Sequence, residues 1–146
     1  MNIKNSLYIG LGGAGIKAMA HTKKMFEDVF GQGCIPPQIG FVAIDFDYAS
    51  VRDQSLPTRI DEDFVAMPDS GDLRQVYESM RGKGLLRWFS PEDAVWLPRH
   101  IGDSARQSRP VGRFMTEYAM PHISRKIDSV FRRVANSVNV NFQGFH

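Results

Sequence analysis

Apolar and polar residues change their spacing twice near the start of the chain. Residues 6–11 (SLYIGL) form a short apolar run without a helical period, which predicts a strand buried on both faces. From residue 13 to residue 30 the apolar side chains recur at helical spacing, and Gly31 follows. Residues 39–47 (IGFVAIDFD) are a second β-rich run with carboxylates at its end. This order predicts two parallel strands joined by a right-handed helical crossover.

The middle of the chain has weaker periodicity and more turn residues. We expect a helical turn at 48–53 and irregular chain with at most a short strand at 56–72. A helix is predicted within 72–89, interrupted by Gly82 and Gly84. A further helix is predicted at 90–97, because Ser90 can cap it and Pro91, Glu92 and Asp93 suit a first turn.

The clearest helical pattern lies near the end of the chain, after a polar loop at 99–110. Apolar residues recur at i, i+3, i+4 and i+7 from Val111 to Val134, with Pro121 inside the pattern, so we expect a kink or break there. Residues 137–145 (SVNVNFQGF) alternate in the manner of a strand.

Composition narrows the class of protein. The 146 residues suit one domain, and 42% hydrophobic with 23% charged residues argue against global disorder. A net charge of +2 does not indicate a nucleic-acid binder. The single Cys34 excludes an internal disulfide, and the His residues lack zinc-site spacing. Without a signal peptide or an apolar run of membrane-spanning length, a soluble cytoplasmic protein is expected.

A G-x-G-x-x-G motif lies between the first predicted strand and helix, at Gly10, Gly12 and Gly15. Glycines allow close approach of the backbone to a phosphate, and the helix N-terminus offers free N–H groups to the anion. A tight strand–helix turn without any ligand is the alternative interpretation. Asp45 and Asp47 come about 30 residues after Gly15, later than the ~20 typical of dinucleotide-binding folds.

A second candidate phosphate contact precedes the long helix. Residues 102–113 (GDSARQSRPVGR) contain several small residues and three arginines, Arg106, Arg109 and Arg113. Arginine forms charge-assisted hydrogen bonds with a terminal phosphate, whereas a solvated basic loop is the alternative. The segment lacks the interleaved aromatic residues of a single-stranded nucleic-acid surface, so no nucleic-acid partner is predicted.

Three segments in this order resemble the tubulin/FtsZ family, closest to its bacterial tubulin-like members: YIGLGGAGIKAMA, FVAIDFD and ARQSRPVGR. The family has a glycine-rich loop after its first strand, a second strand ending in a pattern like AVNTDA, and a third loop ending in VGR before a helix. The resemblance implies an α/β fold with a Rossmann-like parallel sheet flanked by helices. It implies that residues 1–146 form the N-terminal portion of the nucleotide-binding domain.

The same resemblance implies a ligand and its site. The expected ligand is GTP or GDP, with room for Mg2+ beside the two aspartates, although no metal ligand set is identified. The nucleotide-binding residues implied are Gly10, Gly12, Gly13, Ala14, Gly15, Lys17, Asp45, Asp47, Ser104, Ala105, Arg106, Arg109 and Arg113. No catalytic residue is assigned.

The family signature G-G-G-T-G-[ST]-G and its water-activating acidic loop do not occur in this chain. We therefore expect a truncated member or fragment that binds nucleotide without hydrolysing it, whereas the full-length family type would be a GTPase. Self-association or a tubulin-like filament partner is implied. Two alternatives stay open: an NAD- or FAD-binding oxidoreductase that uses Gly10, Gly12, Gly15 and Asp45, and a non-catalytic interaction module.

Overall fold

A computed structural model describes residues 3–69 and 71–137. Strands β1 (Ser6–Leu11) and β2 (Ile39–Ile44) pair in parallel, in register from Ser6 opposite Ile39 to Leu11 opposite Ile44. Helix α1 (Gly12–Phe30) joins them. The predicted β–α–β start is confirmed, but β2 ends at Ile44, so Asp45 and Asp47 follow the strand instead of belonging to it.

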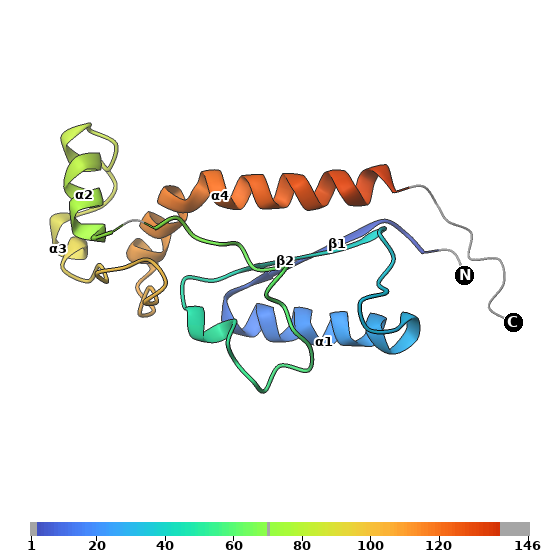
Figure 1. The fold of residues 1–146 in the computed structure, drawn as a ribbon. Coiled ribbons are helices and arrows are strands. Elements are labelled where there is room, and N and C mark those ends of the chain that lie inside the picture. The colour runs from blue at the N-terminus through green and yellow to red at the C-terminus, as the bar shows by residue number, and fades with distance from the viewer. Residues whose placement is uncertain (1–2, 70, 138–146) are drawn as a thin grey trace, which may run out of the picture.

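The sheet lies between two helices, with α1 on one face and α4 (Arg109–Asn136) along the other (Figure 1). Alternate residues of β2 serve the two faces: Phe41 and Ala43 pack with α1, and Val42 joins the cluster that includes α4. Residues 39–43 are all buried. The α/β class predicted from the sequence is thus confirmed as a parallel sheet flanked by helices.

The prediction that residues 6–11 are buried on both faces was wrong. Ile9 is 44% exposed and Leu11 66% exposed, although Gly10 between them is buried. Leu7 packs with the cluster on the α4 side, so by alternation Ile9 and Leu11 face the same side. Helix α4 packs mainly over β2, and that face of β1 stays open toward its second half.

A short extended segment borders β2 on the side away from β1. Phe64 forms a single parallel bridge with Ala43, through hydrogen bonds from the Ala43 N–H to the Asp63 carbonyl and from the Val65 N–H to the Ala43 carbonyl. The short strand expected within 56–72 is therefore a single bridge. It places residues 64–66 at the outer edge of the described sheet.

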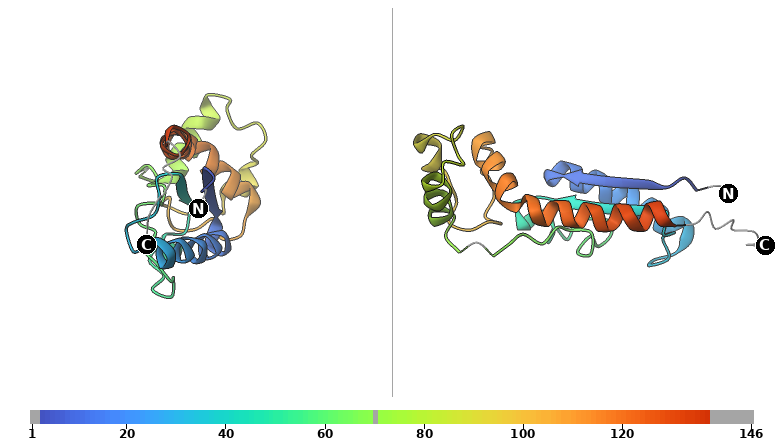
Figure 2. Two further views of the ribbon diagram at one scale, coloured as in Figure 1. Left: turned by 90° about the vertical axis from the view of Figure 1, so that its right-hand side faces the viewer. Right: turned by 90° about the horizontal axis from the view of Figure 1, so that it is seen from above.

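Helix α4 continues through Pro121 without a break. Its first part is bent relative to its long second part (Figure 2), as expected because proline removes a helical hydrogen bond and crowds the preceding turn. The helix begins at Arg109, two residues before the predicted start, so the preceding loop ends at Ser108.

Two shorter helices, α2 (Leu73–Gly82) and α3 (Pro91–Ala94), lie beside the first part of α4, at the end of the molecule away from the second part of α4 (Figures 1 and 2). The ring of Phe89 lies 5.6 Å from that of Tyr77 and 5.3 Å from that of Phe114 on α4, between ring centroids. Helix α3 is one turn long instead of the predicted 90–97. The strand predicted at 137–145 lies, beyond Ser137, outside the described residues.

Candidate functional site

The turn between β1 and α1 is held by close contact between the first and last glycines of the motif. A Cβ added at Gly10 would lie 2.8 Å from the Gly15 carbonyl oxygen and 3.1 Å from the Met19 Cβ. No side chain fits between strand and helix there. Packing alone therefore accounts for Gly10 and Gly15, which is the part of the motif that needs no ligand.

The middle of the same turn is open. Gly12 has a φ of 68°, a left-handed conformation that favours glycine, and no atom lies within 4 Å of where its Cβ would be. Leu11, which precedes α1, makes no side-chain capping bond, and the first turn of the helix has no acidic residue. The N–H groups at Gly12, Gly13 and Ala14 are therefore without a side-chain acceptor at the positive end of the helix dipole, which suits an anion.

The segment after β2 lies against this turn. A Cβ at Gly13 would be 3.4 Å from the Ser50 Oγ, and that hydroxyl donates a short hydrogen bond to the Asp45 Oδ2. Asp45 Oδ1 also accepts from the Asp47 N–H at 3.1 Å. Asp47 caps the 3-10 turn η1 (Tyr48–Ser50) by accepting from the Ala49 N–H at 3.0 Å. Both aspartates thus shape the local turn, and Ser50, which the sequence analysis did not single out, links it to the glycines.

The loop ahead of α4 docks on the same segment. The Tyr48 N–H donates to the Gly102 carbonyl at 3.2 Å, and the Ser104 N–H donates to the Phe46 carbonyl at 2.8 Å. These bonds bring Ser104 and Ala105 to the end of β2 from more than 50 residues away. Three non-glycine residues of the loop have left-handed φ: Ser104 (74°), Arg106 (48°) and Gln107 (62°). Such conformations cost about 1 kcal/mol or more each, so surrounding contacts must hold the loop in place.

Helix α4 begins with a capped N-terminus. Ser108 Oγ accepts from the Val111 N–H at 3.4 Å, the Ser108 carbonyl accepts from the Gly112 N–H at 2.9 Å, and Pro110 has no N–H. Few backbone donors are left for an anion. The sequence analysis identified residues 102–113 as a second candidate phosphate contact, and in this structure any such contact falls to their side chains.

The arginines of this region have different surroundings. The Arg113 guanidinium lies 4.0 Å from the centre of the Trp88 ring, and its Nε donates to Glu117 Oε1 at 3.3 Å. Arg113 therefore joins α4 to the segment between α2 and α3. Arg106 and Arg109 are exposed and make no side-chain hydrogen bond or ion pair among the described residues. Lys17 is exposed on α1, where its charge helps to lower the pKa of Asp53, after the larger effect of hydrogen bonds from Ser55.

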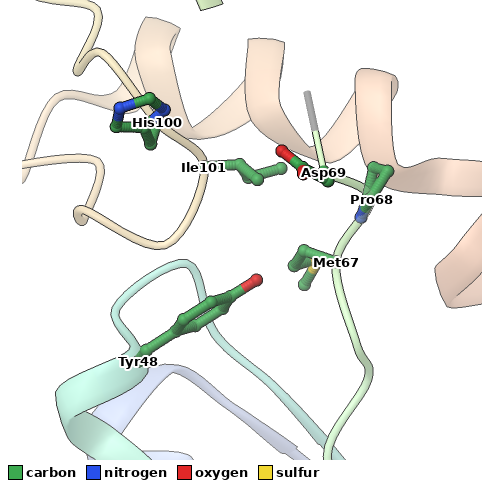
Figure 3. A pocket seen from close by; sticks show the side chains of 6 residues that line it. All are labelled: Tyr48, Met67, Pro68, Asp69, His100 and Ile101. Carbon is green, nitrogen blue, oxygen red and sulfur yellow. The ribbon is translucent and has the colours of Figure 1, made fainter. Parts of the chain in front are cut away.

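A crevice of about 190 Å3 lies behind the docked loop, between residues 67–69 and 100–101 (Figure 3). The Tyr48 ring forms one wall, and its hydroxyl points toward Met67 and Asp69. Burial raises the pKa of the Tyr48 hydroxyl, against the effect of a backbone hydrogen bond from Met67. The same ring lies under Gly102, where a Cβ would meet it at 2.8 Å, so Tyr48 supports the loop.

Within residues 3–69 and 71–137, no group of three or more His, Cys, Asp or Glu side chains could hold a metal ion. The sequence analysis connected Asp45 and Asp47 with Mg2+, and these two carboxylates follow β2 beside the turn. In the same part of the chain, no helix combines the length and apolar character needed to cross a bilayer.

The fold and the turn define the class of the protein as a Rossmann-type α/β domain, with a parallel β–α–β unit around a glycine motif. A comparison with protein families then identifies the particular one. Residues 7–144 match the family model described as "Tubulin like", so the chain belongs to the tubulin-like family. No curated protein and no solved structure matches the chain.

Proposed function

We propose that this chain binds GTP or GDP through the β1–α1 turn, as the N-terminal portion of a tubulin-like nucleotide-binding domain. The observation that carries the proposal is the open, uncapped start of α1 in a chain of this family. The phosphates would meet the N–H groups of Gly12, Gly13 and Ala14. Ser104, Ala105 and the arginines at 106 and 109 would approach the terminal phosphate, with Asp45 and Asp47 on the ribose or Mg2+ side.

The decisive experiment uses one added carboxylate. Ala14 is the exposed third residue of α1, where aspartate favours the helix because of the dipole and repels a bound phosphate. Titration of Ala14→Asp with fluorescent GTP and GDP should show affinity at least about tenfold below that of the wild type, since charges a few ångströms apart at a protein surface interact by several kcal/mol.

The matched control is Gln75→Asp, because Gln75 is the exposed third residue of α2. This variant carries the same new charge at the same helix position and should bind nucleotide like the wild type. Equal affinity of Ala14→Asp and Gln75→Asp would place the phosphates elsewhere. ATP and NAD are titrated in parallel, and tight NAD binding without GTP binding would favour the oxidoreductase alternative, in which Asp45 directly after β2 would accept from a ribose hydroxyl.

Self-association is the second part of the proposal. It is supported by family membership and by the open face of β1, where Ile9 and Leu11 are exposed. Sedimentation velocity with and without GTP tests it, and a monomer at every concentration in both conditions would contradict it.

A further inference from the structure

A groove runs along the outer edge of the described sheet. It lies on the side of β2 that does not pair with β1. One wall is residues 64–66, and the other is a face of α4 with His122, Arg125, Lys126 and Ser129. Its volume is about 420 Å3. The groove is separate from the glycine turn, and none of its residues belongs to the proposed nucleotide site.

The backbone wall of this groove has unused hydrogen-bonding groups. The Asp63 carbonyl and the Val65 N–H both point to Ala43 of β2. Because backbone groups alternate direction along a strand, the Phe64 carbonyl and the Ala66 N–H point away from β2, at the outer edge of the sheet. Within the described residues neither group has a hydrogen-bond partner. This is an edge to which an extended chain can add.

The helical wall is positively charged. Arg125 is exposed and makes no side-chain hydrogen bond or ion pair in the described part of the chain. Lys126 Nζ donates to the Glu62 carbonyl at 2.6 Å and not to a carboxylate, while Lys23 binds the nearby Asp63 carboxylate at 2.6 Å. No acidic residue lines the groove, and His122 lies on the same wall as Arg125 and Lys126.

We infer that this groove binds an acidic, extended segment of a partner protein. The segment would lie along residues 64–66 as an added strand, with its carboxylates on Arg125 and Lys126. The open edge selects an extended backbone, and the basic wall selects Asp or Glu at alternate positions, because side chains of a strand alternate between its faces.

The probe is a fluorescein-labelled octapeptide of four Glu-Thr repeats, compared by fluorescence anisotropy with four Gln-Thr repeats. We expect the Gln peptide to bind at least about tenfold more weakly, and Arg125→Glu to weaken the Glu peptide by a similar factor. Arg74→Glu, an exposed change on α2 far from the groove, is the charge-matched control and should leave binding unchanged. Circular dichroism confirms that each variant is folded.

Two further peptides test the strand geometry at constant charge. One is N-methylated at every Thr and the other at every Glu, so that one of them loses the N–H groups that face the sheet edge. We expect one to bind about tenfold more weakly than the unmethylated peptide. If both methylated peptides bind as tightly as the unmethylated peptide, the proposal that the segment adds to the sheet as a strand is wrong. Equal loss in Arg125→Glu and Arg74→Glu, or tighter Arg125-dependent binding of labelled oligothymidylate, would overturn the acidic protein segment.

Discussion

The two helices that flank the sheet begin in opposite ways. Helix α1 starts in a glycine turn, without a side-chain cap and with open space at Gly12. Helix α4 starts with Ser108 as its cap and Pro110 in its first turn. Both starts lie in segments that contain several small residues, and from the sequence both segments were candidate phosphate contacts. Only at α1 are several backbone donors left without a side-chain acceptor, which distinguishes a helix end suited to a ligand from one that satisfies itself.

The largest effect is expected at Gly10, where the α1 turn packs most closely. In Gly10→Ala the new Cβ would be forced to within 2.8 Å of the Gly15 carbonyl oxygen, so strand and helix must separate. We expect a loss of about 2 kcal/mol in the free energy of unfolding, and a melting temperature lower by about 6 °C. Thermal denaturation measures both.

The control for this change is Gly82→Ala at the end of α2, where a Cβ meets no atom within 4 Å. It should be neutral or stabilising by up to about 1 kcal/mol. A Gly10→Ala variant as stable as the wild type would show that packing does not require the first glycine of the motif. Gly10 would then be assigned to the nucleotide-binding site with Gly12.

A smaller effect comes from exchanging the two kinds of helix start. Ser108→Ala removes the cap of α4 and should cost about 1 kcal/mol of stability, while the affinity for GTP stays within about twofold. Leu11→Ser offers α1 a cap, since Leu11 has an extended backbone and an exposed side chain. It should stabilise the protein by about 0.5 kcal/mol and weaken GTP binding about threefold, because the serine oxygen competes for the same N–H groups. Urea denaturation and nucleotide titration measure the two quantities. A tenfold loss of GTP affinity in Ser108→Ala would mean that the start of α4 holds the nucleotide as well.

The smallest effect is expected at Arg113. Arg113→Lys keeps the charge but loses the planar contact with Trp88, so the free energy of unfolding should fall by about 0.5 kcal/mol. If the wild-type guanidinium stays on Trp88 when nucleotide binds, Arg113→Lys should bind GTP and GDP as tightly as the wild type does. Arg74→Lys, an exposed change on α2 outside the proposed nucleotide site, is the matched control and should leave stability and both affinities unchanged. Weaker GTP binding with unchanged GDP binding in Arg113→Lys would show that Arg113 leaves Trp88 to reach a terminal phosphate.

Much of the fold could be predicted because it depends on local patterns. The change of apolar spacing near Gly12 located β1 and α1, and the helical repeat from Val111 located α4 to within two residues of its start. The boundaries that failed depend on less regular signals. Residues 45–47 extend the β-rich run past Ile44, yet the Asp45 and Asp47 side chains bond to nearby backbone N–H groups and turn the chain out of the strand.

The candidate site was predictable as a set of residues but not as an arrangement. The motif alone indicated a phosphate turn or a ligand-free one. Tertiary contacts divide its glycines into Gly10 and Gly15, which strand–helix packing requires, and Gly12, which is open. Ser50, Tyr48 and Trp88 gave no motif in the sequence, because their roles arise only from the segments that fold against them.

The sequence by itself therefore determined the strand and helix order, the glycine turn and, through its motifs, membership of the tubulin-like family. Spacing along the chain carries that information because it reflects each element's own hydrogen bonds and apolar face. Only the tertiary structure decided that β1 keeps an open face, that Arg113 lies on Trp88, and that a basic face of α4 borders residues 64–66. Each of these depends on contacts between residues far apart in the chain, which local periodicity does not record.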